Sequence, residues 1–294
     1  MATPMQWFAA TRPRTLPAAV APVLVGAVLA FSDDAFDATL SVLAALVALA
    51  LQIGVNYSND YSDGIRGTDA VRLGPTRLVG QGLAPARSVR AAAFASFGIA
   101  ALSGLVIVLI TGEWWLLLLG MLAIISAWFY TGGDNPYGYL GLGELFVFIW
   151  FGLVAVNGTL FVQTGSLADA RGWVLGAGAG ALSCALLVAN NLRDVPTDAQ
   201  VGKRTLAVRL GDARTRGLFT LLLAIGMGSP FALLVLGESV SPVYILCLLP
   251  FLIAHKPGRA VLNGASGTAL LPVLAGTGQV LLAWAIATSA VLLF

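Results

Sequence analysis

Long apolar runs separated by short polar connections make up most of the chain. Runs long enough to cross the roughly 30 Å hydrocarbon core of a bilayer occur near residues 16–31, 39–59, 89–111, 114–130, 144–163, 172–192, 217–236, 240–254 and 269–293. The run at 240–254 is the shortest. This pattern predicts an all-α polytopic membrane protein with nine transmembrane helices in a single bundle.

The composition agrees with a membrane protein. Of 294 residues, 58% are hydrophobic and 10% are charged, and the mean hydropathy is +0.89. A soluble domain carries about 25% charged residues, so this chain cannot cover a water-facing surface. The net charge of +2 gives no indication of nucleic-acid binding. Cys184 and Cys247 lie in apolar runs and read as small core residues, and the single histidine, His255, cannot build a Cys/His metal site.

The distribution of charge predicts the orientation. With a cytoplasmic N-terminus, every Lys and Arg except Arg171 falls on the cytoplasmic side, as the positive-inside rule requires. The opposite connections carry Asp33, Asp34, Asp37, Glu113, Asp169 and Glu238. At the start of the chain, Trp7 and Phe8 favour an interfacial helix leading into the first span over a cleaved signal peptide.

Two cytoplasmic connections are long and carry both signs of charge. They are "NYSNDYSDGIRGTDAVRLGPTRLVGQG" at 56–82 and "NNLRDVPTDAQVGKRTLAVRLG" at 190–211. Both run in the order Asn, two Asp residues, Gly, then Arg or Lys. We interpret this as a weak internal repeat, with a first half at 1–143, a second half at 144–265 and a ninth helix at 266–294. Such halves commonly place a binding site at their interface.

The aspartates of these connections have a spacing that favours a shared site. Asp60 and Asp63 are three residues apart, and Asp194 and Asp198 are four apart, so each pair would share a helix face. Both pairs follow the C-terminal end of a helix, where the macrodipole disfavours carboxylates, so capping does not explain them. Mg²⁺ is typically held by one or two carboxylates plus substrate phosphates. We therefore predict metal ligation, directly or through a diphosphate, by Asn56, Asp60, Asp63, Asp194 and Asp198.

Neighbouring cations suit the remaining phosphate oxygens. The predicted diphosphate-binding residues are Asn56, Arg66, Arg77, Asn190, Lys203 and Arg204, with Asp69 as a further candidate. Carboxylates, magnesium and cations around an apolar cavity would bind a diphosphate with a lipid tail. The alternative is that these charges are solvated, balance one another and anchor the protein at the headgroups.

The third cytoplasmic connection is aromatic and has no Lys or Arg. Its tyrosines, Tyr130, Tyr137 and Tyr139, would either pack against an aromatic acceptor or belong to an interfacial aromatic belt. Glu144 opens an apolar run, and we expect it to cap the helix N-terminus there. The glycines of "LGAGAG" at 175–180 predict close helix packing inside the bundle.

These segments resemble the UbiA superfamily of intramembrane prenyltransferases. "TRPRTLPAAVAPVLVGA" at 11–27, "QIGVNYSNDYSDGIRGTD" at 52–69 and "YTGGDNPYGYLGLGELFVF" at 130–148 are similar to the branch that prenylates 1,4-dihydroxy-2-naphthoate in menaquinone synthesis. The resemblance covers almost the whole chain. Tyr57, Asp134 and Asn191 depart from the pattern, which leaves open which side chain contacts which metal ion.

The resemblance implies an enzyme of the cell membrane with its active site facing the cytoplasm. It would use Mg²⁺ to transfer a polyprenyl group from polyprenyl diphosphate to 1,4-dihydroxy-2-naphthoate, with loss of CO₂, giving a demethylmenaquinone. Another aromatic acceptor, such as 4-hydroxybenzoate or homogentisate, is an alternative within the same superfamily. A secondary transporter is a further alternative, although its acids should lie at mid-span rather than among arginines.

Overall fold

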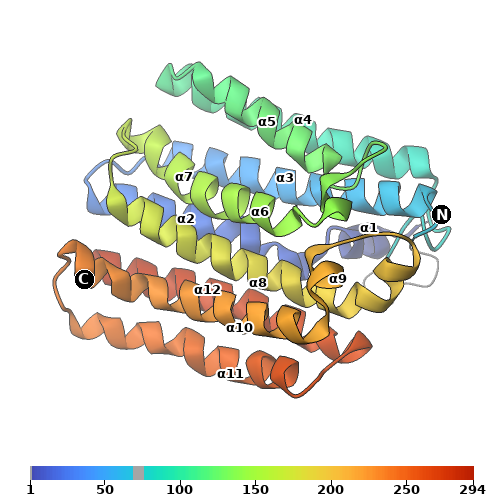
Figure 1. The fold of residues 1–294 in the computed structure, drawn as a ribbon. Helices are drawn as coiled ribbons and strands as arrows, with labels where there is room; N and C mark the ends of the chain where they lie inside the picture. Colours follow the sequence, from blue (N-terminus) through green and yellow to red (C-terminus); the bar gives the residue numbers. More distant parts are fainter. Residues whose placement is uncertain (1, 69–75) are drawn as a thin grey trace.

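The computed structural model describes residues 2–68 and 76–294, and every regular element in these residues is helical. The long helices run side by side in one bundle (Figure 1). The elements are α1 (Pro4–Ala10), η1 (Pro13–Thr15), α2 (Pro17–Ser32), α3 (Ala38–Ile65), α4 (Ala86–Thr111), α5 (Trp115–Phe129), η2 (Tyr137–Leu140), α6 (Gly143–Phe148), π-helical η3 (Ile149–Val154), α7 (Ala155–Thr164), α8 (Ala170–Gln200), α9 (Leu206–Leu210), α10 (Asp212–Gly228), η4 (Ser229–Leu236), η5 (Pro242–Leu248), α11 (Leu249–Leu262), η6 (Gly267–Leu270) and α12 (Leu271–Leu293).

The length and hydropathy of these helices fit a multi-pass membrane protein. Within the described residues, seven helices are long and apolar enough to cross a bilayer, or eight if the bent pair Pro4–Thr15 and Pro17–Ser32 counts as one span. The remaining apolar run forms α5, which has 15 residues. Leu102, Leu109 and Leu252 are among the many large apolar side chains that face outward, as lipid contact requires. The nine-span count and the orientation stay predictions.

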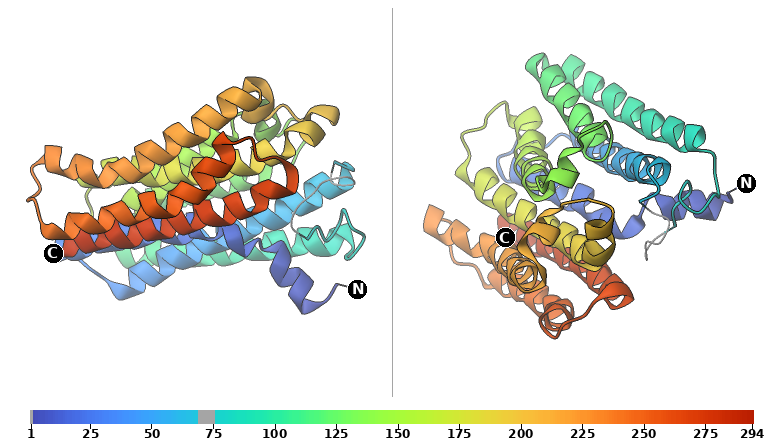
Figure 2. Two further views of the ribbon diagram at one scale, coloured as in Figure 1. Left: turned by 90° about the horizontal axis from the view of Figure 1, so that it is seen from below. Right: turned by 45° about the vertical axis from the view of Figure 1, so that its right-hand side comes forward.

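The N-terminal segment bends away from the bundle. Thr3 begins α1 with a capping box to Gln6. The helical path is then interrupted at Arg12, whose φ of 54° is left-handed. The segments Pro4–Thr15 and Pro17–Ser32 meet at a bend of 55°. Figure 2 shows α1 turned outward from the other helices. Phe8 is 59% exposed on α1, which agrees with the predicted interfacial helix.

The core is built around α8. It is the most buried candidate span, with 78% of its apolar stretch buried. A Cβ atom added to Gly152 would lie 2.5 Å from the Gly176 carbonyl oxygen and from the Gly180 Cα atom. The predicted close packing of the 175–180 glycines is therefore confirmed, and it brings η3 directly against α8.

The helices continue further than the hydropathy pattern indicates. We expected the polar connections to begin at residues 56 and 190, but α3 runs to Ile65 and α8 to Gln200. Those starting points were wrong, because the polar side chains there are buried and bonded inside the protein. Asn56, for example, is buried and donates to the Thr11 carbonyl oxygen at 2.8 Å. The signature residues therefore stand on rigid helix ends.

Candidate functional site

The two aspartate-rich segments meet at one end of the bundle. Lys203 Nζ, just after α8, lies 3.5 Å from Asp63 Oδ2 on α3, and both side chains are buried. The ends of α3 and α8 lie at the same end of the bundle in Figure 1. This contact brings together residues about 140 positions apart in the chain, as the predicted shared site requires.

Tyr139 joins the third connection to the same cluster. Its hydroxyl donates to Asp63 Oδ1 at 2.7 Å, and Lys203 Nζ lies 4.9 Å from its ring centroid. The Arg66 guanidinium lies 5.4 Å from the same centroid. Burial, reinforced by the charge of Asp63, raises the pKa of Tyr139 well above its usual range. Tyr139 is therefore a neutral hydrogen-bond donor within the cluster.

Asp60 holds the later part of the first cytoplasmic connection against the end of α3. Its carboxylate is 1% exposed and accepts the backbone N–H groups of Leu78 at 2.7 Å and Val79 at 3.0 Å. Arg77, which immediately precedes these amides, is also buried. A carboxylate that accepts two backbone donors is strongly held. Asp60 thereby fixes residues 77–79 beside the end of α3.

Asp194 is held by a residue that the sequence analysis passed over. Arg193 donates from Nε and Nη2 to the two carboxylate oxygens of Asp194, each at 2.7 Å, and from Nη2 to Asn190 Oδ1 at 2.9 Å. Both members of the ion pair have side chains that are 2% exposed. Asp198 is buried one turn further along α8. The adjacent letters "RD" in a long helix were the signal for this pair.

The other predicted cations have distinct environments. Arg66 donates to the carbonyl oxygens of Thr131 and Gly133, which ties the end of α3 to the turn after α5. Arg204 is exposed, and its backbone N–H donates to the Tyr139 carbonyl oxygen at 3.1 Å. The candidate Asp69 lies outside the described residues.

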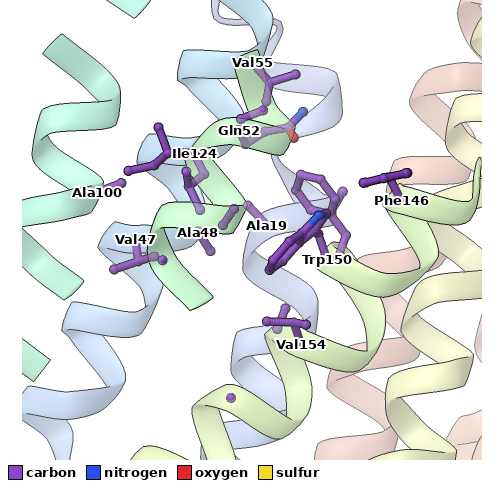
Figure 3. A pocket seen from close by; sticks show the side chains of 18 of the residues that line it. Ala19, Val47, Ala48, Gln52, Val55, Ala100, Ile124, Phe146, Trp150 and Val154 are labelled. Atoms are coloured by element: carbon purple, nitrogen blue, oxygen red, sulfur yellow. The ribbon is translucent and has the colours of Figure 1, made fainter. Parts of the chain in front are cut away.

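A cavity of about 540 Å³ begins at the helix turns that precede the aspartates, at Asn56 on α3 and Asn190 on α8, and continues into the apolar interior (Figure 3). The four predicted aspartates are not among the residues that line it. Its walls come from α2, α3, α4, α5, the α6–α7 segment and α8. Ala19, Val47, Ala48 and Ile124 are typical of the apolar part. A volume in this range suits a small-molecule site, and an apolar wall suits a hydrocarbon chain.

Amide and hydroxyl groups form the polar end of the cavity. Asn56 donates to Thr15 Oγ1 at 3.2 Å, and Gln52 donates to the same oxygen at 2.9 Å. Asn59 accepts the Thr131 hydroxyl at 2.8 Å. Since the Asn56 amide group donates to the protein, its Oδ1 is the atom suited to a cation or a ligand donor. Asn190 lines the cavity from α8.

Several residues of this polar end were missed in the sequence. Arg12, Thr15, Gln52 and Asn59 all line the cavity. Gln52 interrupts an apolar run, and an isolated amide in such a run marks a functional position in membrane helices. Arg12 reaches the cavity because the chain breaks between α1 and α2, and Pro13 and Pro17 were the signal for that break.

The tyrosines of the third connection separate into two environments. Tyr130 and Tyr137 line the cavity, and their rings lie 5.5 Å apart in an edge-to-face arrangement. Tyr137 also stacks on Phe146 at 4.1 Å and donates to the Ser126 carbonyl oxygen at 2.8 Å. Burial raises the pKa of Tyr137, so its ring stays neutral. Tyr139 belongs to the Asp63 cluster instead.

Glu144 lies in the first turn of α6, as expected, but its contacts extend beyond that helix. Glu144 Oε1 also accepts a hydrogen bond from Asn191 Nδ2 at 3.0 Å. The expected position of Glu144 at the helix N-terminus is confirmed, and the bond to Asn191 is an additional contact. Glu144 connects α6 to α8 across the buried interface.

The carboxylate and amide oxygens of this site are the type of ligand that binds a hard divalent cation. Within residues 2–68 and 76–294, no group of three or more His, Cys, Asp and Glu side chains could hold a metal ion by itself. Carboxylate and amide oxygens are nevertheless the ligands that Mg²⁺ prefers, and protein sites for Mg²⁺ rely on substrate phosphates and water for the remaining positions. The site therefore fits a cation that arrives with a phosphate ligand.

A helical membrane bundle with two aspartate segments above an apolar cavity is the architecture of intramembrane prenyltransferases. Residues 19–266 match the sequence profile of the UbiA prenyltransferase family, and the chain belongs to that family. It is 49% identical to the 1,4-dihydroxy-2-naphthoate octaprenyltransferase of Mycobacterium tuberculosis, covering 100% of this chain and 99% of that protein. It is 36% identical to the Escherichia coli protein of the same name, covering 92% and 89%.

Solved structures share the fold. A UbiA homolog from Aeropyrum pernix superposes with a TM-score of 0.71 at 17% identity, covering 92% of this chain and 96% of that one. A UbiA homolog from Archaeoglobus fulgidus bound to GPP and Mg²⁺ gives a TM-score of 0.67 at 15% identity, covering 98% and 100%.

Proposed function

We propose that this protein transfers a polyprenyl group from polyprenyl diphosphate to 1,4-dihydroxy-2-naphthoate. The observation that carries the proposal is the contact of Lys203 with Asp63, since it joins the two aspartate segments whose asparagines, Asn56 and Asn190, line the apolar cavity. The names of the relatives with 36% and 49% identity support the same acceptor.

The diphosphate is assigned to the polar cluster and the tail to the cavity. Asn56, Asp60, Asp63, Asp194 and Asp198 would hold Mg²⁺ directly or through the diphosphate, and Asn190 would contact the diphosphate. When bound, Mg²⁺ supplies charge that stabilises the departing diphosphate. The structure of a family member with GPP and Mg²⁺ supports this use of a divalent cation.

The cations of the chain act on the same leaving group. Lys203 is buried beside Asp63, so a diphosphate that enters between them exchanges an ion pair for phosphate contacts. Arg66, Arg77 and Arg204 are the other proposed phosphate ligands. Fixed positive charge aimed at a group that gains negative charge lowers the barrier to bond cleavage.

The proposed prenyl transfer takes place where the apolar cavity excludes water. The allylic C–O bond breaks, and its electron pair leaves with the diphosphate. The ring carbon that bears the carboxylate forms the new C–C bond to the allylic carbon. The carboxylate departs as CO₂, and the electron pair of that bond restores the aromatic ring. Apolar walls keep water away from the allylic cation, which water would otherwise capture.

Tyr130 and Tyr137 are the proposed contacts of the acceptor ring. Both line the cavity beside its polar end, where Tyr137 stacks on Phe146, so the cavity wall there is aromatic. We assign Tyr139 to support of Asp63, because its hydroxyl donates to that carboxylate. The proposal also includes a cytoplasmic N-terminus, nine spans in two similar halves plus one, and a site that opens to the cytoplasmic face of the cell membrane.

The test uses purified protein in lipid nanodiscs. It receives 1,4-dihydroxy-2-naphthoate and a long-chain polyprenyl diphosphate, with Mg²⁺ or with EDTA, and products are identified by mass spectrometry. A prenylated naphthoquinol that has lost CO₂, formed only with Mg²⁺, is expected. Product with 4-hydroxybenzoate or homogentisate, and none with the naphthoate, would replace the acceptor but keep the reaction. No product with any acceptor from folded protein would refute the proposal.

A further inference from the structure

Two buried polar atoms stand in the apolar part of the cavity. Trp150 Nε1 and Ser183 Oγ have no hydrogen-bond partner among the described residues, and both side chains line the cavity. Ser183 is 1% exposed. Proteins rarely leave buried donors unsatisfied unless a ligand, a water molecule or a function uses them. These two atoms therefore point to a ligand that carries an acceptor oxygen.

The fold holds Trp150 in place through an irregular helix. It lies in the π-helical η3, and such widened turns occur frequently at functional sites. Gly152 and Gly180 allow η3 to lie directly against α8, the helix that carries Ser183. Figure 3 shows the Trp150 indole inside the cavity between Phe146 and Val154.

These donors are separate from the diphosphate end. Ser183 precedes Asn190 by seven residues on α8, which corresponds to about 10 Å of helix. Trp150 lies nearly two helical turns beyond Glu144 along the α6–η3 segment. They therefore stand deeper in the bundle than the groups assigned to phosphate and metal.

We propose that Trp150 Nε1 and Ser183 Oγ bind the hydroxyl oxygen of the aromatic acceptor that points away from the diphosphate. This inference rests on the proposed function. The two hydroxyl groups of the acceptor are para to each other, so their oxygens point in opposite directions. When the carboxylate-bearing carbon faces the allylic carbon, the adjacent hydroxyl lies toward the polar end. The opposite hydroxyl then enters the apolar part of the cavity.

The prenyl tail does not account for these donors. An isoprenoid chain has no oxygen to accept a hydrogen bond, so it would leave both groups unsatisfied. The oxygen of an acceptor hydroxyl has two lone pairs and can accept a hydrogen bond from each of them. A site built to hydrogen-bond a substrate hydroxyl also rejects analogues that lack it, because its own polar groups then lose their partner. The pair would thus select for a 1,4-dihydroxylated ring.

The test compares Trp150→Phe and Ser183→Ala with two matched controls. Trp128→Phe removes an indole that stacks on Tyr61, outside the residues that line the cavity. Ser96→Ala removes a hydroxyl that donates to the Ala92 carbonyl oxygen. KM values for the naphthoate and for the prenyl diphosphate are measured for each protein in nanodiscs. The inhibition constant of 1-hydroxy-2-naphthoate, which lacks the 4-hydroxyl, is measured as well.

Each variant at the pair is expected to raise the acceptor KM about threefold to tenfold, as the loss of one hydrogen bond predicts. The diphosphate KM and both controls should be unchanged. The inhibition constant of the 4-deoxy analogue should not rise in the variants, because its complex with the native protein already leaves both donors without an acceptor. Ser183→Ala provides an independent measurement should Trp150→Phe fail to fold.

An unchanged acceptor KM in an active enzyme would overturn this inference and leave the proposed function intact. A change confined to the diphosphate KM, or in the tail length of the product, would assign the pair to the tail and also overturn it. A native protein that does not prenylate the naphthoate at all would refute the proposed function, and this inference with it.

Discussion

The two aspartate segments look alike in sequence and differ in how the protein holds them. Asn56 and Asp60 have the same four-residue spacing as Asn190 and Asp194, and both asparagines line the cavity. Asp60 accepts two backbone N–H groups from another part of the chain. Asp194 instead forms a buried ion pair with Arg193 on its own helix.

The two segments thus use different groups to stabilise a buried carboxylate inside a membrane protein. The backbone amides at Asp60 stabilise its charge and also fix the returning connection, so the carboxylate contributes to local structure. The guanidinium at Asp194 neutralises the carboxylate but adds a second buried charge, which is costly when either partner is removed. The first segment should therefore tolerate substitution better than the second.

Asp194→Ala tests the second segment and should have the largest effect. It leaves the Arg193 guanidinium buried without its carboxylate, and breaking a buried pair in this way costs about 3–5 kcal/mol. We expect a clear fall in the unfolding temperature in nanodiscs, followed by tryptophan fluorescence, together with loss of prenyl transfer. An unfolding temperature equal to that of the native protein would contradict the stabilising role of the pair.

The double variant Arg193→Met with Asp194→Leu is the matched control. Replacing both charges by apolar groups of similar volume is often neutral for stability. The unfolding temperature should therefore return toward the native value while prenyl transfer stays absent. Recovery of transfer in this variant would show that the Asp194 carboxylate has no part in the reaction.

Asp60→Asn tests the first segment and should affect stability less. Asparagine offers one acceptor oxygen where the carboxylate offers two, so either the Leu78 or the Val79 N–H loses its partner, at a cost of about 1–3 kcal/mol. Turnover should fall about 10²-fold, as for loss of an electrostatic group at a reacting centre. The Mg²⁺ concentration for half-maximal rate should also rise.

Asp34→Asn serves as the control for this experiment. Asp34 is exposed between α2 and α3, at the end of α3 away from Asp60. It should leave stability, rate and Mg²⁺ dependence unchanged. Should Asp60→Asn behave like Asp34→Asn, the metal role of Asp60 would be wrong.

The helical architecture was predictable because hydropathy records burial in lipid directly. Each apolar run predicted from the sequence corresponds to one helix or to two or three joined helical segments. The ends of α3 and α8 were not predictable in the same way, since polar residues that bond inside the protein look like a connection in a hydropathy profile. Asn56 and Asp60 illustrate this error, because both are buried and helical.

The meeting of the two aspartate segments was also predictable, but their internal contacts were not. The order of Asn, Asp and Arg predicted one shared site, and Lys203 and Asp63 bring the segments together, while the phosphate chemistry stays a prediction. It could not reveal that the Asp60 carboxylate accepts the amides of Leu78 and Val79, because backbone amides leave no sequence signal. The unsatisfied Trp150 indole was hidden for a related reason, since one aromatic residue in an apolar run resembles a core residue.

Tyr139→Phe tests the residue that joins the two segments and should have the smallest effect. Its hydroxyl donates to Asp63 on α3, and its carbonyl oxygen accepts the Arg204 N–H after α8. The variant removes only the first bond and keeps the ring beneath Lys203. We expect the KM for prenyl diphosphate to rise about threefold to tenfold, with Tyr244→Phe as an unaffected control.

The pH dependence sharpens this last prediction. Burial and the charge of Asp63 raise the pKa of Tyr139, so the protonated hydroxyl is the form that the folded protein stabilises. That contribution is complete below the usual tyrosine pKa of about 10 and is lost only as the pH rises through the raised value. The ratio of native to Tyr139→Phe KM should therefore stay constant between about pH 6 and 9. A ratio that changes within this range would mean that Tyr139 ionises there, and Asp63 would then lack the neutral donor that links its helix to the second segment.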